Sequence, residues 1–125
     1  MLEEYLSIAA EVEHELDKVK GSRFLAIAAP VCTPEQALAV VERARKRFHD
    51  ARHWGFAWRL GPQGAELRYS DDGEPSGSTG KPLFQEIEGR GLCDVVVVVT
   101  RWFGGTKLGV GGLVRACGGA AAVAL

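Results

Sequence analysis

Residues 95–115 read VVVVVTRWFGGTKLGVGGLVR, and this stretch decides the fold. Five consecutive valines predict a β-strand that is buried on both faces. The strand ends at Arg101 and two aromatic residues, and a glycine loop then leads into a helix of small residues. Ligand sites commonly follow such strands, because glycines leave backbone N–H groups free, and here Arg101, Lys107 and Arg115 add positive charge. We therefore place a candidate anion or partner site here, with a tight connection that binds nothing as the alternative.

Composition indicates a soluble globular protein. The 125 residues are enough for one domain with a sizeable core, and 46% hydrophobic and 25% charged residues are ordinary values. No apolar run approaches the ~20 residues of a membrane span, and the acidic N-terminus is unlike a signal peptide. Cys32, Cys93 and Cys117 are widely spaced in apolar surroundings and form no C-x-x-C motif, which indicates reduced core thiols. The expected location is the cytoplasm.

The net charge of -1 conceals an uneven distribution. Residues 1–17 carry six acidic residues and no Lys or Arg, whereas residues 18–68 carry ten Lys or Arg and four acidic residues. The asymmetry indicates a basic face that could meet an acidic partner or a phosphate backbone, although a solvated helix face would explain it equally well. The overall charge gives no support to tight nucleic-acid binding.

Periodicity and turn residues predict eight elements in the order ββαββαβα. The expected strands are 11–20, 24–31, 53–60, 65–69 and 94–103, and the expected helices are 34–48, 82–88 and 113 onward. The first helix has an N-cap at Thr33, a proline at 34 and a capping box completed by Gln36. This order predicts an α+β fold with a mixed sheet covered by helices, mainly on one face. The last helix reaches Leu125 without a cap, so we expect the natural domain to continue.

A second glycine-rich segment, residues 71–82, reads DDGEPSGSTGKP. It is no P-loop, because Pro75 replaces the first glycine and Pro82 the Ser or Thr that would reach Mg²⁺. Residues 109–114 likewise lack the third glycine of a dinucleotide fingerprint, since Val114 stands there. The carboxylates could ligate a hard cation, but local turn bonding is the favoured interpretation. We predict an exposed interaction loop without a metal or cofactor.

Three alternating aromatic residues, Trp54, Phe56 and Trp58, fall on one face of a strand. Exposed, they would form a stacking platform for nucleic-acid bases; buried, they would belong to the core. Burial is favoured, and His53 and Arg59 would then point outward on the opposite face. No catalytic base or nucleophile pairs convincingly with another group, so an enzyme is the less favoured class.

Arg115 is expected in the first turn of the last helix, where the helix dipole disfavours a cation by about 0.3–1 kcal/mol. A bound anion would reverse this effect, and so would a nearby carboxylate from Asp71, Asp72 or Glu74. The second case would join the two glycine-rich segments into one surface.

The candidate site combines both segments with His53. The proposed binding residues are Asp71, Asp72, Glu74, Ser76, Ser78, Thr79 and Lys81 from the first segment, Arg101, Gly104, Gly105, Lys107, Gly111, Gly112 and Arg115 from the second, and His53. Arg43, Arg45, Lys46 and Arg47 would extend this surface.

Residues 71–82 and 99–116 closely resemble the two signatures of the IMPACT/YigZ family, with support from 20–24 and 50–53. The sequence departs from the family at Trp54-Gly55, where Cys or another polar residue is common. The resemblance implies a fold like the second domain of small-subunit ribosomal protein S-five, which elongation factor G shares. It also implies one such domain over 1–125, followed in bacterial members by a ferredoxin-like domain, in agreement with the uncapped end.

The resemblance also implies a link to translation. Eukaryotic relatives compete for the activator of a stress-responsive initiation-factor kinase and associate with ribosomes, and RNA or ribosome binding is suggested for bacterial members. We therefore predict a non-enzymatic regulatory protein that binds RNA, the ribosome or a protein partner, and no membrane. One alternative is a metal-assisted enzyme that acts on a phosphorylated small molecule or nucleotide through Asp71, Asp72 or Glu74.

Overall fold

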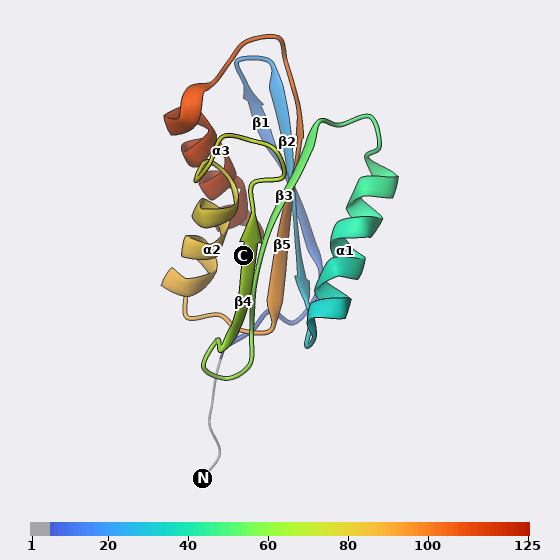
Figure 1. Cartoon of the computed structure of the whole chain (residues 1–125), viewed down its shortest axis with the longest axis vertical. Coiled ribbons are helices and arrows are strands. Elements are labelled where there is room, and N and C mark those ends of the chain that lie inside the picture. Colours follow the sequence, from blue (N-terminus) through green and yellow to red (C-terminus); the bar gives the residue numbers. More distant parts are fainter. Residues whose placement is uncertain (1–5) are drawn as a thin grey trace.

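The computed structural model describes residues 6–125 and has the predicted order of elements (Figure 1). The elements are β1 (Val12–Val19), β2 (Ser22–Pro30), α1 (Pro34–Arg47), β3 (His53–Leu60), β4 (Glu66–Ser70), α2 (Gly80–Gly89), β5 (Val95–Trp102) and α3 (Gly109–Ala124). The predicted α+β class and all eight elements are thus confirmed. The largest shift in a boundary is at α3, which begins four residues earlier than expected.

The five strands form one sheet in the order β1-β2-β5-β3-β4. Each of the four neighbouring pairs is antiparallel. The expectation of a mixed sheet was therefore wrong. The valine-rich strand β5 lies at the centre, between β2 and β3. Its central place explains the unbroken apolar run, because a strand with a neighbour on each side and helices over both faces meets no water.

Helices cover both faces of the sheet, which corrects the expectation of one main face. On one face, α1 packs on a cluster that includes Val96, Val98, Phe56 and Trp58. On the other, α2 and α3 pack on a cluster that includes Val97. Phe56 and Trp58 are each 4% exposed, so the favoured burial is confirmed for these two residues, while Trp54 is half-buried at the edge of the same cluster.

The outer part of β3 is less open than predicted. Arg59 does not point freely outward, because its Nη1 donates to the backbone carbonyl of Leu92 at 2.9 Å. The side of β3 opposite the aromatic stripe lies under α2, where a Cβ on Gly55 would stand 2.2 Å from the Thr79 side chain. The beginning of the strand, at His53, borders an open cavity.

The N-terminus of α1 forms as its sequence predicts. Thr33 Oγ1 accepts a hydrogen bond from the backbone N–H of Gln36 at 3.1 Å, and Gln36 Oε1 accepts one from the N–H of Cys32 at 2.8 Å. The reciprocal bond thus reaches one residue further back than in a standard capping box. Cys32 is exposed, unlike the other two free thiols, so the expectation of core thiols holds for Cys93 and Cys117 only.

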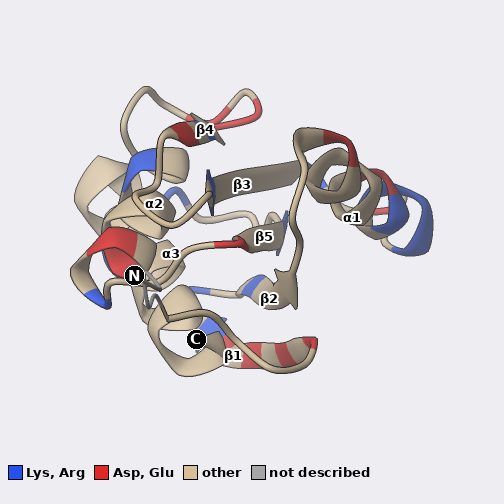
Figure 2. Ribbon diagram, turned by 90° about the horizontal axis from the view of Figure 1, so that it is seen from below, with Lys and Arg blue, Asp and Glu red and all other residues tan. Residues whose placement is uncertain are grey.

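The acidic and basic segments of the sequence neutralise each other in the fold. Figure 2 shows acidic residues along β1 and basic residues along α1. Glu11 pairs with Arg43 and Glu13 with Arg47, while Arg45 Nη2 lies 2.9 Å from Asp72 Oδ1. The predicted basic extension along α1 is therefore largely occupied by intramolecular ion pairs. Within residues 6–125, no helix is long and apolar enough to cross a membrane.

Candidate functional site

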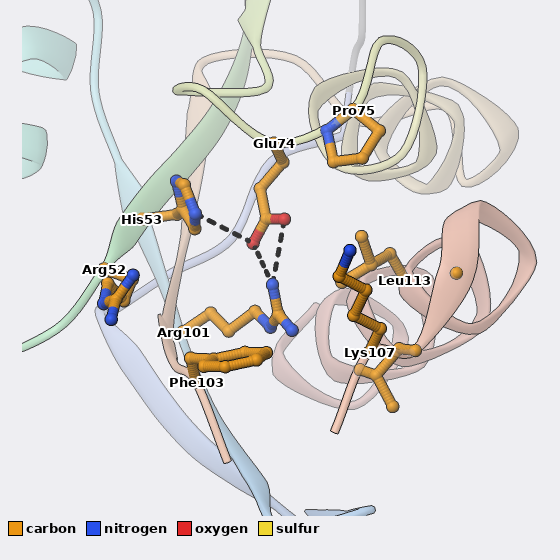
Figure 3. Close-up of a pocket in the computed structure, with 10 residues that line it drawn as sticks. Arg52, His53, Glu74, Pro75, Arg101, Phe103, Lys107 and Leu113 are labelled. Atoms are coloured by element: carbon orange, nitrogen blue, oxygen red, sulfur yellow. Dashed lines mark hydrogen bonds and ion pairs between the residues drawn. The ribbon is translucent and has the colours of Figure 1, made fainter. Parts of the chain in front are cut away.

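A cavity of about 340 Å³ lies where the loops after β4 and β5 meet the start of β3 (Figure 3). Its lining contains charged residues from three segments and an apolar wall. The charged or ionisable lining residues are Arg52, His53, Glu74, Arg101 and Lys107, and the others are Pro75, Phe103, Leu108, Gly109 and Leu113. The two glycine-rich segments, far apart in the sequence, therefore border one space.

A buried ion pair joins the two segments. Arg101 Nη1 lies 2.8 Å and 2.9 Å from the two carboxylate oxygens of Glu74, and the side chains are 8% and 4% exposed. The expectation that a carboxylate ties the segments together is met, but the cation is Arg101 rather than Arg115. The charge of Arg101 is thus already balanced by Glu74, so Arg101 brings no free positive charge to the cavity, contrary to the expectation from the sequence.

The remaining donors of Arg101 are poorly used. Its Nη2 reaches Ser22 Oγ only at 3.5 Å, and its buried Nε has no acceptor among the described residues. Ser22 Oγ also accepts the N–H of Gly104 at 3.2 Å, which holds the start of the β5–α3 loop against β2. A Cβ at Gly104 would stand 2.1 Å from the carbonyl carbon of Gly21, so this contact requires glycine.

His53 stands opposite Arg101 in the β3–β5 ladder and forms one wall of the cavity. Its Nδ1 lies 2.8 Å from the backbone carbonyl of Asp72, and because a carbonyl only accepts, Nδ1 carries the proton. This bond orients the ring and leaves Nε2 3.8 Å from Glu74 Oε1. Figure 3 shows Arg52 and His53 on one side of the Glu74–Arg101 pair, with Lys107 and Leu113 on the other.

The loop between β4 and α2 satisfies its own polar groups. Asp71 accepts hydrogen bonds from the backbone N–H groups of Gly77, Thr79 and Gly80 at 2.9–3.1 Å. Burial raises the pKa of Asp71, but these three bonds outweigh it, and the pKa lies below its ordinary value. Asp71 thereby caps α2, because the side chain of the N-cap residue, Thr79, makes no capping bond to the helix.

The other polar residues of this loop divide into internal and exposed groups. Asp72 accepts the N–H of Trp54 at 2.9 Å, and Ser78, fully buried, donates to the Pro75 carbonyl. Thr79 is also buried, whereas Ser76 and Lys81 are exposed. These bonds fit the structured-turn interpretation, and residues 6–125 contain no group of three His, Cys, Asp or Glu arranged to hold a metal ion.

The loop between β5 and α3, unlike the loop before α2, provides no side-chain cap for the helix that follows it. The N-cap residue of α3, Leu108, offers no side-chain bond, and the first turn contains no acidic residue. The first N–H groups of this helix therefore lack a side-chain acceptor, and Gly109, its first residue, lines the cavity. Gly105 lies in the exposed loop, and Gly111 and Gly112 lie in the first turns of α3.

Arg115 lies elsewhere than the sequence indicated. Because α3 begins at Gly109, Arg115 is in its second turn, and the dipole argument for a first-turn cation does not apply. Its side chain lines a second cavity of about 240 Å³ together with Lys20, and Leu108 borders both cavities. The structure thus places Arg101 and Arg115 in the linings of two different cavities.

Four cations surround the loop between β5 and α3. We call these residues the basic end: Lys20, Arg52, Lys107 and Arg115. None of the four forms an ion pair within the described chain. Phe103, 41% exposed, lies among them, with the Arg52 and Arg101 guanidinium carbons 5.7 Å and 5.5 Å from its ring centre. The sequence reasoning missed Arg52, although it directly precedes His53, and missed the apolar wall.

Comparisons with known proteins agree on one family. The Impact N-terminal domain matches residues 20–125. The chain is 52% identical over 107 residues to the "IMPACT family member in pol 5'region" of Thermus thermophilus, covering 86% of this chain and 56% of that protein. It is 42% identical over 120 residues to the "IMPACT family member YigZ" of Escherichia coli, covering 94% and 58%. The chain thus spans a little over half the length of these relatives.

Two solved structures share the fold. One, a crystal structure of a hypothetical protein, matches with a TM-score of 0.93 and 41% identity, covering 99% of this chain and 61% of that one. The other is the two-domain translational regulator Yih1, with a TM-score of 0.50 and 28% identity, covering 86% and 43%. The fold of the described residues is therefore that of known relatives.

Proposed function

The chain belongs to the IMPACT family, and from this premise we propose that it is a non-enzymatic regulator of translation that binds RNA, in particular on the ribosome, through its basic end. Lys20, Arg52, Lys107 and Arg115 would contact phosphates, and Phe103 would contact a base. The proposal places this activity in the cytoplasm and needs no cofactor. Because the chain spans little more than half of its relatives, it concerns this part of the protein.

The distribution of charge carries the proposal. The arginines of α1 and β2 are engaged with Glu11, Glu13, Glu15 and Asp72, whereas the cations of the basic end make no ion pair with a described residue. Cations that stay available on one side of a protein with a net charge of -1 are suited to a phosphate backbone. An exposed aromatic ring among them is typical of proteins that bind single-stranded RNA.

The name of a relative supports the biological setting. The structural neighbour Yih1 is described as a translational regulator. The carboxylates themselves favour a binding protein over a metal-assisted enzyme. Asp71, Asp72 and Glu74 already accept hydrogen bonds from other groups of the protein, which leaves them less available to a metal ion.

Salt-dependent RNA binding tests the proposal. Fluorescence anisotropy would measure the affinity for a labelled single-stranded RNA, and co-sedimentation would measure ribosome binding, between 50 and 200 mM salt. Each lost phosphate contact should lower the slope of log K against log salt by about 0.7 for a single strand. The double variant Lys107→Ala/Arg115→Ala should therefore bind more weakly and with a shallower slope.

A matched control removes the same charge from α1. Arg43→Ala/Lys46→Ala changes two exposed residues away from the basic end and should leave RNA affinity within a factor of two. Equal losses in both double variants, or binding that does not respond to salt, would contradict the proposal. Recovery of a protein partner that survives nuclease, without measurable RNA binding, would replace it with a protein–protein role.

A further inference from the structure

We propose that the cavity at the basic end is a binding site for one nucleotide unit, with its phosphate at the N-terminus of α3 and its base against the apolar wall. The unit could be a free mononucleotide or an unstacked residue of an RNA strand. The inference deepens the proposed function. It rests on the proposed function only where the nucleotide unit belongs to an RNA strand.

The phosphate position follows from the start of α3. A helix N-terminus carries partial positive charge and unsatisfied N–H groups, which attract a phosphate when no side chain caps them. At α2 the carboxylate of Asp71 takes this role, but at α3 neither a capping side chain nor a first-turn acid does so. Lys107 immediately precedes this turn, and Arg52 lines the opposite wall, so two cations face the same space.

The incomplete hydrogen bonding of Arg101 is a second, independent indication of an anionic ligand. This residue is 7% exposed and lines the cavity, yet it holds Glu74 through a single nitrogen. Its Nε has no acceptor in residues 6–125, and its Nη2 has only the long contact to Ser22. A buried guanidinium normally satisfies its donors, because a buried donor that lacks an acceptor loses its hydrogen bonds to water without replacement. Nε itself is closed to solvent, so the donor that an anionic ligand in the cavity would use is the weakly engaged Nη2.

The size and chemistry of the cavity require more than a bare anion. At about 340 Å³ it falls at the lower end of the range for small-molecule pockets, about 300–1,000 Å³. Inorganic phosphate would leave the wall formed by Phe103, Leu108 and Leu113 in contact with water. A planar base attached to the phosphate would cover that wall, and Phe103 offers the aromatic ring that bases commonly contact.

Isothermal titration calorimetry with AMP, adenosine and inorganic phosphate as probes tests the inference. AMP should bind at least tenfold more tightly than either half alone, because the cavity recognises both. Arg52→Ala and Lys107→Ala should each weaken AMP at least fivefold. Phe103→Ala should weaken AMP and adenosine but leave phosphate unchanged. Arg43→Ala/Lys46→Ala, on α1, should bind AMP as the parent does, and thermal melts would show that every variant is folded.

The outcomes separate this inference from the proposed function. AMP binding that equals phosphate binding, or that Phe103→Ala leaves intact, would overturn the nucleotide site. AMP binding with the expected variant pattern but without RNA binding would identify a free mononucleotide as the ligand and remove the proposed function alone. RNA binding that neither AMP competition nor Phe103→Ala weakens would keep the proposed function and overturn the site.

Discussion

Removing Glu74 should destabilise the protein far more than removing a carboxylate from an exposed ion pair. Glu74→Ala leaves the Arg101 guanidinium, 8% exposed, without its counter-charge. Breaking a buried pair in this way costs about 3–5 kcal/mol. The cavity lets water approach one side of Arg101, so we expect the lower end, about 3 kcal/mol. For a chain of 125 residues, about 4 °C of melting temperature correspond to 1 kcal/mol, so the expected fall is roughly 10 °C.

Urea unfolding followed by circular dichroism measures this cost, and Glu15→Ala is the matched control. Glu15 pairs with Arg23 at a similar distance, 2.8 Å, but these side chains are 44% and 39% exposed, so its loss should be close to undetectable. The double variant Glu74→Leu/Arg101→Met should recover most of the lost stability, because it removes both buried charges together. A Glu74→Ala protein as stable as the Glu15→Ala protein would refute the reasoning.

Three further predictions concern pH, packing and thiol reactivity. The pKa of Asp71 is lowered in the fold, so the carboxylate contributes fully to stability above its ordinary pKa of about 3.9. This contribution is lost as the pH falls through the lowered pKa of the folded protein. Between pH 7 and 2, the melting temperature of Asp71→Asn should therefore fall less steeply than that of the parent. Gly104→Ala should lower the free energy of unfolding, measured in urea, by about 1–3 kcal/mol, because its Cβ would clash with the β1–β2 turn. Gly119→Ala has open space around its Cβ position and should raise the free energy of unfolding by up to about 1 kcal/mol. The opposite order of stabilities would contradict the contact at Gly104. Burial raises the pKa of Cys117 to about 12, so a thiol reagent at pH 8 should modify exposed Cys32 rapidly in the folded protein and Cys117 only after unfolding.

The basic segments show how sequence position misleads about charge. Ten Lys or Arg within residues 18–68 indicated a basic face along the first helix, but Glu11, just before β1, and Glu13, in β1, neutralise part of it from some thirty positions earlier. Ion pairs form between side chains that the fold brings within a few ångströms, and sequence spacing contains no such information across separate elements. The four cations of the basic end, in contrast, make no ion pair with a described residue.

The antiparallel sheet has a related explanation. The turn at 61–64 predicts the hairpin of β3 and β4, which the structure confirms, but the sequence did not predict the order of the whole sheet, because alternation and β-branched residues describe one strand at a time. With β2 and β3 on either side of β5, both faces of the sheet are apolar, and helices cover both. The strand register then places His53 beside Arg101, from positions 48 residues apart.

By itself, the sequence determined the order of elements, the burial of the valine strand and the capped start of α1, because these depend on local periodicity and on hydrogen bonds between near neighbours. The family signatures likewise marked the two glycine-rich segments. Only the tertiary structure decided that Glu74 meets Arg101, that Arg115 belongs to a second cavity and that Arg52 joins the first. These outcomes depend on strand register and on where α3 begins, which the packing of the whole sheet fixes.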